Sequence, residues 1–418
     1  MRLSSGSCLF ACVVAALAAA DVGRPSAQAQ PSSPLRVESL ESPAGSNSAQ
    51  PQLSASAGGV LLSWIERDGP RATLKFSERT ATGWTPARTV AGGTNWFVNW
   101  ADVPSVVKLA GGTLAAHWLQ KSGSETYAYD VRLSYSKDGG KTWSPSFLPH
   151  HDGTKTEHGF ASLFSMPSGL GLIWLDGRAM TPGDHGGHGG GAMSLRYGAF
   201  DAGWKQVADS PVDLKVCECC PTAAAMTADG PIVAFRNLGD GDIRDIAVSR
   251  LQNGAWTQPV EVGNDRWQLA ACPVNGPALS ARGRDVAIAW FSGSNNQNRA
   301  MLAFSSDAGR TFTAPVRIDA KGSLGRVDVE LLENGSAAAS WIEHAAGVAG
   351  LRMATFNRSG MSSAPVTVAP MRTDRSSGYP RIAGGRGELV IAWTESTPAV
   401  APATGNVFRV RTAMAKTR

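Results

Sequence analysis

Short apolar segments recur along the chain at a nearly constant spacing. Each of seven repeats carries one aromatic residue, 51 to 61 residues from the next: Trp64, Trp118, Trp174, Phe235, Trp290, Trp341 and Trp393. Thirteen or fourteen residues before the aromatic residue another apolar segment begins, and in five repeats a proline marks its start: Pro51, Pro104, Pro221, Pro277 and Pro380. A period of this length indicates repeated supersecondary units.

The first repeat shows how one unit is built. Residues 52–56 and 72–78 alternate between apolar and polar positions, residues 60–66 form an apolar run, and residues 86–90 form a further short segment. Glycine-containing turns separate these segments, as expected for strands joined by hairpins. Four antiparallel strands per repeat are typical of a propeller blade. The chain is therefore predicted to be all-β, a β-propeller of four-stranded antiparallel blades.

Counting the repeats predicts seven blades, with six as the alternative if the N-terminal unit is irregular. The last repeat supplies only three good strands, at residues 380–384, 389–395 and 407–414. Residues 35–40 precede the first unit and have no other partner. We therefore expect residues 35–40 to provide the fourth strand of the last blade, which closes the ring and covers both sheet edges.

The first 29 residues read as a signal peptide. Met1 and Arg2 give a positive start, Leu9 to Ala20 form an apolar run, and Ala27-Gln28-Ala29 provides a small-residue cleavage pattern. Residues 30–418 would then form one propeller domain, exported to the periplasm or beyond. The formal net charge is +5 without a run of Lys or Arg, so we expect no nucleic-acid partner. We also expect no membrane span, since no later segment has the required apolar length.

Two repeats carry the pattern S-x-D-x-G-x-T-[W/F] between their third and fourth strands. The first instance contains Ser136, Asp138, Gly140 and Trp143, and the second contains Ser305, Asp307, Gly309 and Phe312. The aspartate can accept backbone N–H groups inside a tight turn, the glycine permits a positive φ, and the aromatic ring can fill the space between blades. We interpret these eight residues as structural.

With these two motifs, the repeat resembles the Asp-box (BNR-repeat) superfamily, whose members include the exo-alpha-sialidases (neuraminidases). The resemblance covers the whole chain after the leader and is specific for the fold. It implies a possible glycoside hydrolase or glycan-binding protein that needs no cofactor and takes a glycan or a small acidic ligand. A sialidase site in this family holds the substrate carboxylate with three arginines, and uses a tyrosine nucleophile activated by a glutamate together with an aspartate acid/base.

Carried onto this chain, the resemblance proposes candidates on the loops that enter the first strand of each blade or join its second and third strands. The substrate-binding candidates are Arg178, Arg236, Arg326 and Arg381, and the catalytic candidates are Tyr379, Glu330 (or Glu157) and Asp328 (or Asp102). The family's arginine-bearing segment near the N-terminus is absent, and seven repeats exceed the usual six. The alternative is that these arginines bridge loops and that Tyr379 is a packing residue.

Four cysteines remain after the leader, and they suggest a different function. Cys217, Cys219, Cys220 and Cys272 enter the first strands of two adjacent blades at matching positions, so we expect them to meet. In an exported protein the default is a disulfide, here between Cys272 and one member of the cluster. The sharper alternative is a copper or zinc site with thiolate ligands. The second functional hypothesis is therefore a non-enzymatic periplasmic propeller with a metal-binding or redox cluster.

Histidines give one further hint of chemistry. A glycine-rich insertion carries His185 and His188, which could hold a transition metal or could simply belong to the insertion. His158, in Glu157-His158-Gly159, is the histidine that we expect to face the central site.

Overall fold

The computed structural model describes Met1 and residues 35–56, 58–181, 191–361, 363–385, 387–399 and 405–416. The predicted signal peptide, apart from Met1, and the two histidines of the glycine-rich insertion lie outside these residues. Contacts divide the chain into residues 1–30 and 31–418, and all that follows concerns the second unit. No helix in the described ranges is long and apolar enough to cross a bilayer.

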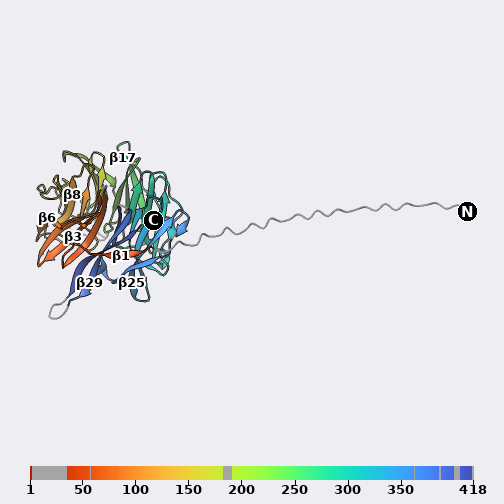
Figure 1. Cartoon of the computed structure of the whole chain (residues 1–418). Helices are drawn as coiled ribbons and strands as arrows, with labels where there is room; N and C mark the ends of the chain where they lie inside the picture. Colours follow the sequence, from red (N-terminus) through yellow and green to blue (C-terminus); the bar gives the residue numbers. More distant parts are fainter. Residues whose placement is uncertain are drawn as a thin grey trace. The chain divides into compact units, whose positions relative to one another are not determined.

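The described strands form seven antiparallel sheets, which confirms the all-β propeller and its seven blades (Figure 1). The first three blades are built from β2 (Ser48–Ser56), β3 (Gly59–Asp68), β4 (Arg71–Thr80), β5 (Gly83–Trp84) and β6 (Arg88–Gly93); from β7 (Ser105–Lys108), β8 (Leu114–Lys121) and β9 (Tyr129–Ser136); and from β10 (His158–Met166), β11 (Gly169–Asp176), β12 (Ser194–Asp201) and β13 (Gln206–Asp213).

The next three blades follow the same plan. They consist of β14 (Ala223–Thr227), β15 (Gly230–Arg236), β16 (Ile246–Gln252), β17 (Ala255–Trp256) and β18 (Val260–Glu261); of β19 (Ala278–Arg282), β20 (Asp285–Ser292), β21 (Arg299–Ser305) and β22 (Val316–Arg317); and of β23 (Ser323–Leu331), β24 (Ala337–Ala345), β25 (Val348–Asn357), β26 (Gly360–Met361) and β27 (Val366–Met371). In blade 2 the fourth strand is reduced to a bridge in which Leu133 and Phe147 exchange two backbone hydrogen bonds of 2.8 and 2.9 Å.

The seventh blade joins the two ends of the described chain. Its sheet order is β1-β30-β29-β28, with β28 (Arg381–Gly385), β29 (Glu388–Pro398), β30 (Asn406–Lys416) and the N-terminal strand β1 (Val37–Leu40). In Figure 1 the orange-red β1 lies among the blue strands of this blade. The register pairs Val37 with Ala415 and Leu40 with Thr412. The predicted closure of the ring by residues 35–40 is therefore confirmed.

The repeated aromatic residues pack each blade against the blade before it. Trp174 of blade 3 is fully buried in a cluster with Leu133 of blade 2. Trp64 of blade 1 is equally buried against Val390 and Val410 of blade 7, so the same contact crosses the closure point. Removing such a side chain from a core typically costs about 3–5 kcal/mol. The sequence period thus reflects a contact made once per blade.

The aspartates of the two S-x-D-x-G-x-T motifs hold their turns together as expected. Asp138 accepts hydrogen bonds from the hydroxyls of Ser136 (2.8 Å) and Thr142 (2.7 Å) and from the Thr142 backbone N–H (3.0 Å). Hydrogen bonds from Thr142 and Ser136 lower the pKa of Asp138 well below its usual value. Trp143 meets Phe76 of blade 1 edge to face at 6.0 Å, so its ring does fill the space between blades.

Three first strands share one irregularity where they enter the centre of the ring. The pairing of β2, β10 and β23 with the following strand shifts register at the same place, as in a β-bulge. At each shift one non-glycine residue has a positive φ: Gln50 (57°), Phe160 (49°) and Arg326 (52°).

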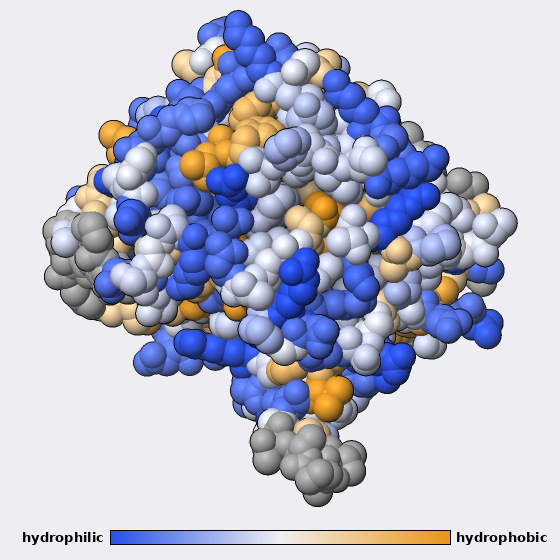
Figure 2. All heavy atoms as spheres, turned by 90° about the vertical axis from the view of Figure 1, so that its left-hand side faces the viewer, coloured by the Kyte–Doolittle hydropathy of each residue, from blue (hydrophilic) through white to orange (hydrophobic). Residues whose placement is uncertain are grey.

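Figure 2 shows a mostly hydrophilic face with small, separate apolar groups.

Closure by β1 is testable by truncation. We expect a chain that begins at Glu41, without β1, to have a melting temperature at least about 4 °C below that of a chain that begins at Leu35, because about four backbone hydrogen bonds are lost and the edge of β30 is exposed. Differential scanning calorimetry of the two truncated proteins measures the difference. Equal melting temperatures and equal monomer fractions would show that β1 does not close the ring.

Candidate functional site

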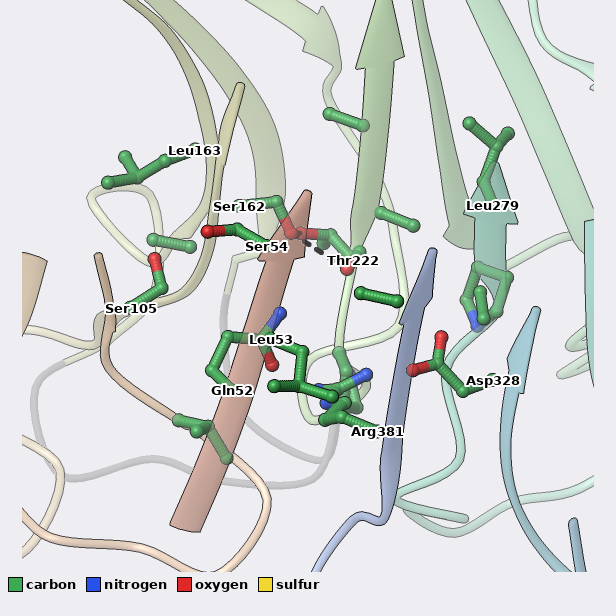
Figure 3. A pocket seen from close by; sticks show the side chains of 18 of the residues that line it. Gln52, Leu53, Ser54, Ser105, Ser162, Leu163, Thr222, Leu279, Asp328 and Arg381 are labelled. Atoms are coloured by element: carbon green, nitrogen blue, oxygen red, sulfur yellow. Dashed lines mark hydrogen bonds between the residues drawn. The ribbon is translucent and has the colours of Figure 1, made fainter. Parts of the chain in front are cut away.

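The first strands of all seven blades line an axial channel of about 240 Å³ (Figure 3). Its wall carries Asp102, Asp328, Glu330 and Arg381 among small and apolar side chains. Figure 3 shows the side chains of Asp328 and Arg381 on the same side of the channel, next to β28. The predicted catalytic residues Asp328 and Glu330 thus do face a central cavity.

Burial controls the charge of the channel carboxyl groups. It raises the pKa of Asp102 to about 7 and that of Glu330 to about 7. Burial also raises the pKa of Asp328, although the charge of Arg381 opposes this, and its Oδ2 accepts the backbone N–H of Ile382 at 2.8 Å. Near neutral pH, protonation therefore limits the negative charge inside the channel.

A buried tyrosine joins Glu157, the alternative activating glutamate, to Asp102, the alternative acid/base. The Tyr129 hydroxyl lies 2.6 Å from Oε1 of Glu157 and 3.2 Å from Oδ2 of Asp102. Burial, with the nearby charges of Glu157 and Asp102, raises the pKa of Tyr129 well above 10, and burial raises that of Glu157 to about 8. Tyr129 was not predicted as a site residue. It opens the third strand of blade 2, where the sequence pattern indicates a core position. We call these three residues the tyrosine network.

Tyr379, the predicted nucleophile, has different partners. Its hydroxyl donates to the Val274 carbonyl at 2.6 Å, and its ring stacks on Trp100 at 5.8 Å. Glu330, its predicted activator, instead accepts from the Ser280 hydroxyl at 3.2 Å. Tyr379 is 2% exposed, and burial raises its pKa. The hydrogen bonds of the structure therefore do not couple Tyr379 to Glu330.

Two of the four predicted arginines are fully engaged elsewhere. Arg178 forms a bidentate pair with Asp176, with both nitrogen–oxygen distances at 2.7 Å. Arg236 donates to the backbone carbonyls of Asn275, Phe291 and Arg244, so it bridges neighbouring loops. Arg178 also lies 3.4 Å from Oδ2 of Asp152 in the preceding loop, so the geometry of both arginines matches the loop-bridging alternative.

The other two arginines meet around Tyr379, and we call Arg326 and Arg381 the arginine pair. The charges of both lower the pKa of Tyr379 against the larger effect of burial. The Arg326 guanidinium stacks over Trp100 at 4.9 Å, and that of Arg381 lies 5.4 Å from the Tyr379 ring centre. One buried N–H nitrogen of each, Nη1 of Arg326 and Nε of Arg381, has no hydrogen-bond partner among the described residues. The arginine pair therefore retains capacity for an anion.

The four cysteines do gather, as the sequence predicted. The Sγ atoms of Cys217, Cys219 and Cys220 all lie within 4.8 Å of one another, and those of Cys217 and Cys220 are 3.4 Å apart. The Cys272 thiol reaches Cys219 across the boundary between blades 4 and 5. No disulfide links any of the four in this structure. We call this group the thiol cluster.

One glycine explains how the two cysteine-bearing segments come so close. A Cβ on Gly276 would collide with the Pro221 carbonyl, so only glycine allows this approach. Pro221 directly follows Cys220, and Gly276 lies four residues after Cys272. Pro221 to Ala224 line the channel, which places the thiol cluster at the channel mouth.

A buried arginine tunes the thiol cluster. Nη1 of Arg244 lies 3.1 Å from Sγ of Cys217 and 3.1 Å from Oε2 of Glu218, and its Nε donates to the Leu269 carbonyl at 2.8 Å. Burial opposes ionisation of Cys217, but hydrogen bonds from Cys219 and Cys220 and the charge of Arg244 lower its pKa well below the usual value. The pKa values of Cys219 and Cys220 are raised. Arg244 and the neighbouring thiols thus favour ionisation of Cys217 over that of Cys219 or Cys220.

The donor set fits a soft or borderline metal ion. Thiolate sulfur favours Cu(I) and Zn²⁺ over hard cations. Cys217 and Cys220 are almost fully buried, whereas Cys272 is exposed, so an ion could enter from the Cys272 side. Sequence reasoning found the cysteines but had no signal for Arg244, which lies in a polar loop.

Comparisons with known proteins support the fold. The chain matches no family model and no curated protein. Among solved structures, the phage phi92 endosialidase is similar with a TM-score of 0.50 and 10% identity, over 92% of this chain and 69% of that one. The polysaccharide lyase Uly1 (TM-score 0.48, 10% identity, 88% and 90% covered) and the Hadza microbial sialidase Hz136 (0.46, 13%, 85% and 74%) are also similar. At 10% identity, the likeness to the endosialidase shows a shared fold alone.

The tyrosine network predicts an unusual pH dependence of stability. The pKa values of Glu157 and Asp102 are raised to about 8 and about 7, so the folded protein binds more protons than the unfolded chain between about pH 4 and pH 8. The free energy of unfolding should therefore fall as the pH rises through this window. Glu157→Gln should remove on the order of 1–3 kcal/mol of this fall.

Urea unfolding at several pH values measures this effect. Glu125→Gln, at an exposed position on the loop before Tyr129, is the matched control and should leave the pH profile unchanged. A Glu157→Gln profile that is parallel to that of the unaltered protein would contradict the assignment.

Proposed function

We propose that this chain is an exported propeller that binds a soft metal ion, copper(I) or zinc, through the thiol cluster at the mouth of its channel. The observation that carries the proposal is the convergence of four thiols from two blades, with three Sγ atoms within 4.8 Å of one another. Thiolates at this density are the donors that Cu(I) and Zn²⁺ prefer. A bound ion would supply charge neutralisation for the thiolates.

The surrounding residues support this role. Arg244 stabilises the Cys217 thiolate and, through the Leu269 carbonyl, ties the Cys217 segment to the loop that leads to Cys272. Its 2% exposure means that water does not compete for this contact. The scaffold is rigid, because the cysteine segments are fixed between two blades of a closed ring. A preformed thiol site of this kind needs little rearrangement to accept an ion.

Metal content and thiol content together test the proposal. Protein purified without chelators should contain about one copper or zinc per chain by inductively coupled plasma mass spectrometry. After denaturation with a chelator it should show four titratable thiols. Cys219→Ser and Cys272→Ser should each lower the metal content at least about tenfold. Met180→Ser, which removes a half-buried sulfur atom outside the thiol cluster, is the control and should keep full metal content.

Two other outcomes would contradict metal binding by the thiol cluster. Protein with no metal and no free thiol would favour structural disulfides, as the sequence also allowed. Protein whose thiol count changes reversibly with the redox buffer, still without metal, would favour a redox element. Either result would overturn metal binding.

A second candidate is a glycan or small acidic ligand, and a separate observation favours it. The arginine pair lies close enough to Tyr379 to lower its pKa, and each arginine keeps one buried N–H nitrogen without a hydrogen-bond partner among the described residues. Guanidinium groups pair well with carboxylates. The tyrosine network additionally offers a tyrosine between a glutamate and an aspartate, the residue types that a sialidase uses. A hydrolase could thus bind its substrate at the arginine pair.

Binding and turnover can be separated for this candidate. We expect N-acetylneuraminic acid to bind by isothermal titration calorimetry, and Arg326→Gln and Arg381→Gln to weaken binding at least about tenfold through loss of a charge-assisted hydrogen bond. The control is Arg409→Gln at an exposed position of β30. Release of 4-methylumbelliferone from its sialic acid conjugate, abolished by Tyr129→Phe, would show a hydrolase. If the protein neither binds N-acetylneuraminic acid nor releases 4-methylumbelliferone, this second candidate function is ruled out.

A further inference from the structure

We infer that blades 2 and 3 share a second metal site, formed by Asp130, His150 and His158, which suits a borderline divalent transition ion such as Zn²⁺. It shares no residue with the thiol cluster and uses different donor atoms. One oxygen of Asp130 and one nitrogen of each imidazole all lie within 4.8 Å of one another. Asp130 is in β9, His158 opens β10, and His150 lies in the segment between them.

The two histidines form a stacked pair that faces two carboxylates. Their ring centres are 3.9 Å apart and the rings are nearly parallel, at 5°. On one side, Oδ2 of Asp152 lies 3.2 Å from Nδ1 of His150 and 3.2 Å from Nε2 of His158. On the other side, Oδ1 of Asp130 lies 3.8 Å from Nε2 of His150 and 3.5 Å from Nδ1 of His158. The remaining nitrogen of each ring therefore points toward the same oxygen.

These remaining nitrogens are buried without a hydrogen-bond partner. Nε2 of His150 and Nδ1 of His158 have none among the described residues, although the two side chains are only 3% and 0% exposed. A buried polar atom without a partner is costly, and native proteins rarely keep one. Ligand atoms bound about 2.0–2.2 Å from zinc lie roughly 3–3.6 Å apart, close to the spacing seen here. A metal ion between these three atoms would satisfy both nitrogens.

Asp152 favours the His150 tautomer that metal binding requires, because Nδ1 of His150 hydrogen-bonds to Oδ2 of Asp152 and Nε2 is left toward Asp130. Nε2 of His158 lies 3.2 Å from the same Asp152 oxygen without a hydrogen bond, so a metal ion on Nδ1 would leave the Nε2 proton close to this carboxylate. Metal-bound histidines typically donate their other N–H to a carboxylate in this way. Two imidazoles and one carboxylate are a donor set for Zn²⁺, Fe²⁺ or Co²⁺ rather than for Cu(I).

Asp176 is not available as a ligand, so the ligand set is restricted to Asp130, His150 and His158. Asp176 also lies near His158, but Arg178 occupies both of its oxygens and Trp174 donates to one of them. Asp130 keeps a 17% exposed side chain, so an ion can enter from its side. Two members of the tyrosine network adjoin the site, since Tyr129 precedes Asp130 and Glu157 precedes His158. The metal site therefore fastens the network between two blades.

Cobalt titration of the purified full chain tests the site directly. We expect two classes of Co²⁺ site: one with intense near-ultraviolet thiolate charge-transfer bands, from the thiol cluster, and one with visible d–d bands only. Asp130→Asn and His150→Gln should weaken only the second class, at least about tenfold. The matched control is His151→Gln, an exposed neighbour that contacts Gln206.

A metal-free measurement keeps a folding defect apart from loss of a ligand. The circular dichroism and melting temperature of Asp130→Asn in excess chelator should match those of the unaltered protein in chelator, and only the latter should gain thermal stability on addition of Zn²⁺. Absence of a sulfur-free cobalt class would overturn the site and would favour an imidazolium held by carboxylates. So would a cobalt class that survives both substitutions. Neither outcome bears on the thiol cluster.

Discussion

One repeated contact holds the molecule together: the aromatic residue of each second strand packs against the preceding blade, and all but the partly buried Trp393 are buried. A blade alone exposes both faces of its sheet, so its stability depends on two neighbours. Trp64 makes this contact with Val390 and Val410 of the last blade, and β1 pairs with β30 of the same sheet. Because the ring is closed, the first strands are held side by side, and their entry loops converge at one mouth. Both candidate ligand sites near the axis depend on this geometry.

The fold could be predicted from the sequence because its signal is repetitive. The seven aromatic positions, the prolines before them and the unpartnered segment 35–40 each report on local structure or on a contact repeated per blade. The predicted approach of the two cysteine-bearing segments is seen in the contact between Cys219 and Cys272, since equivalent positions of adjacent blades are neighbours in any propeller. In a repeat protein, the spacing of residues in the sequence therefore predicts which residues of adjacent blades lie close together.

Individual side-chain partners could not be predicted in the same way. Arg178 and Arg236 lie on the correct loops, but Asp176 and three backbone carbonyls bind them, and such contacts depend on loop conformations with no periodic signal. Tyr129 was not predicted for a different reason: it lies in a strand, where a buried tyrosine fits the pattern of any other core residue. Arg244 was missed because its partners come from a loop 27 residues earlier in the chain. Sites built between loops are therefore visible only in three dimensions.

The bulges of β2, β10 and β23 have a consequence for how this scaffold can diversify. Each sets one residue, Gln50, Phe160 or Arg326, in the left-handed backbone region at the rim of the mouth. The backbone strain of such a position, on the order of 1–3 kcal/mol, is met by the surrounding sheet, and it is largest for β-branched side chains. An amide, an aromatic ring and a guanidinium all occupy the same backbone frame here. The rim thus has three positions at which the side chain can be substituted. Such substitutions can change ligand preference while the fold of the ring stays the same.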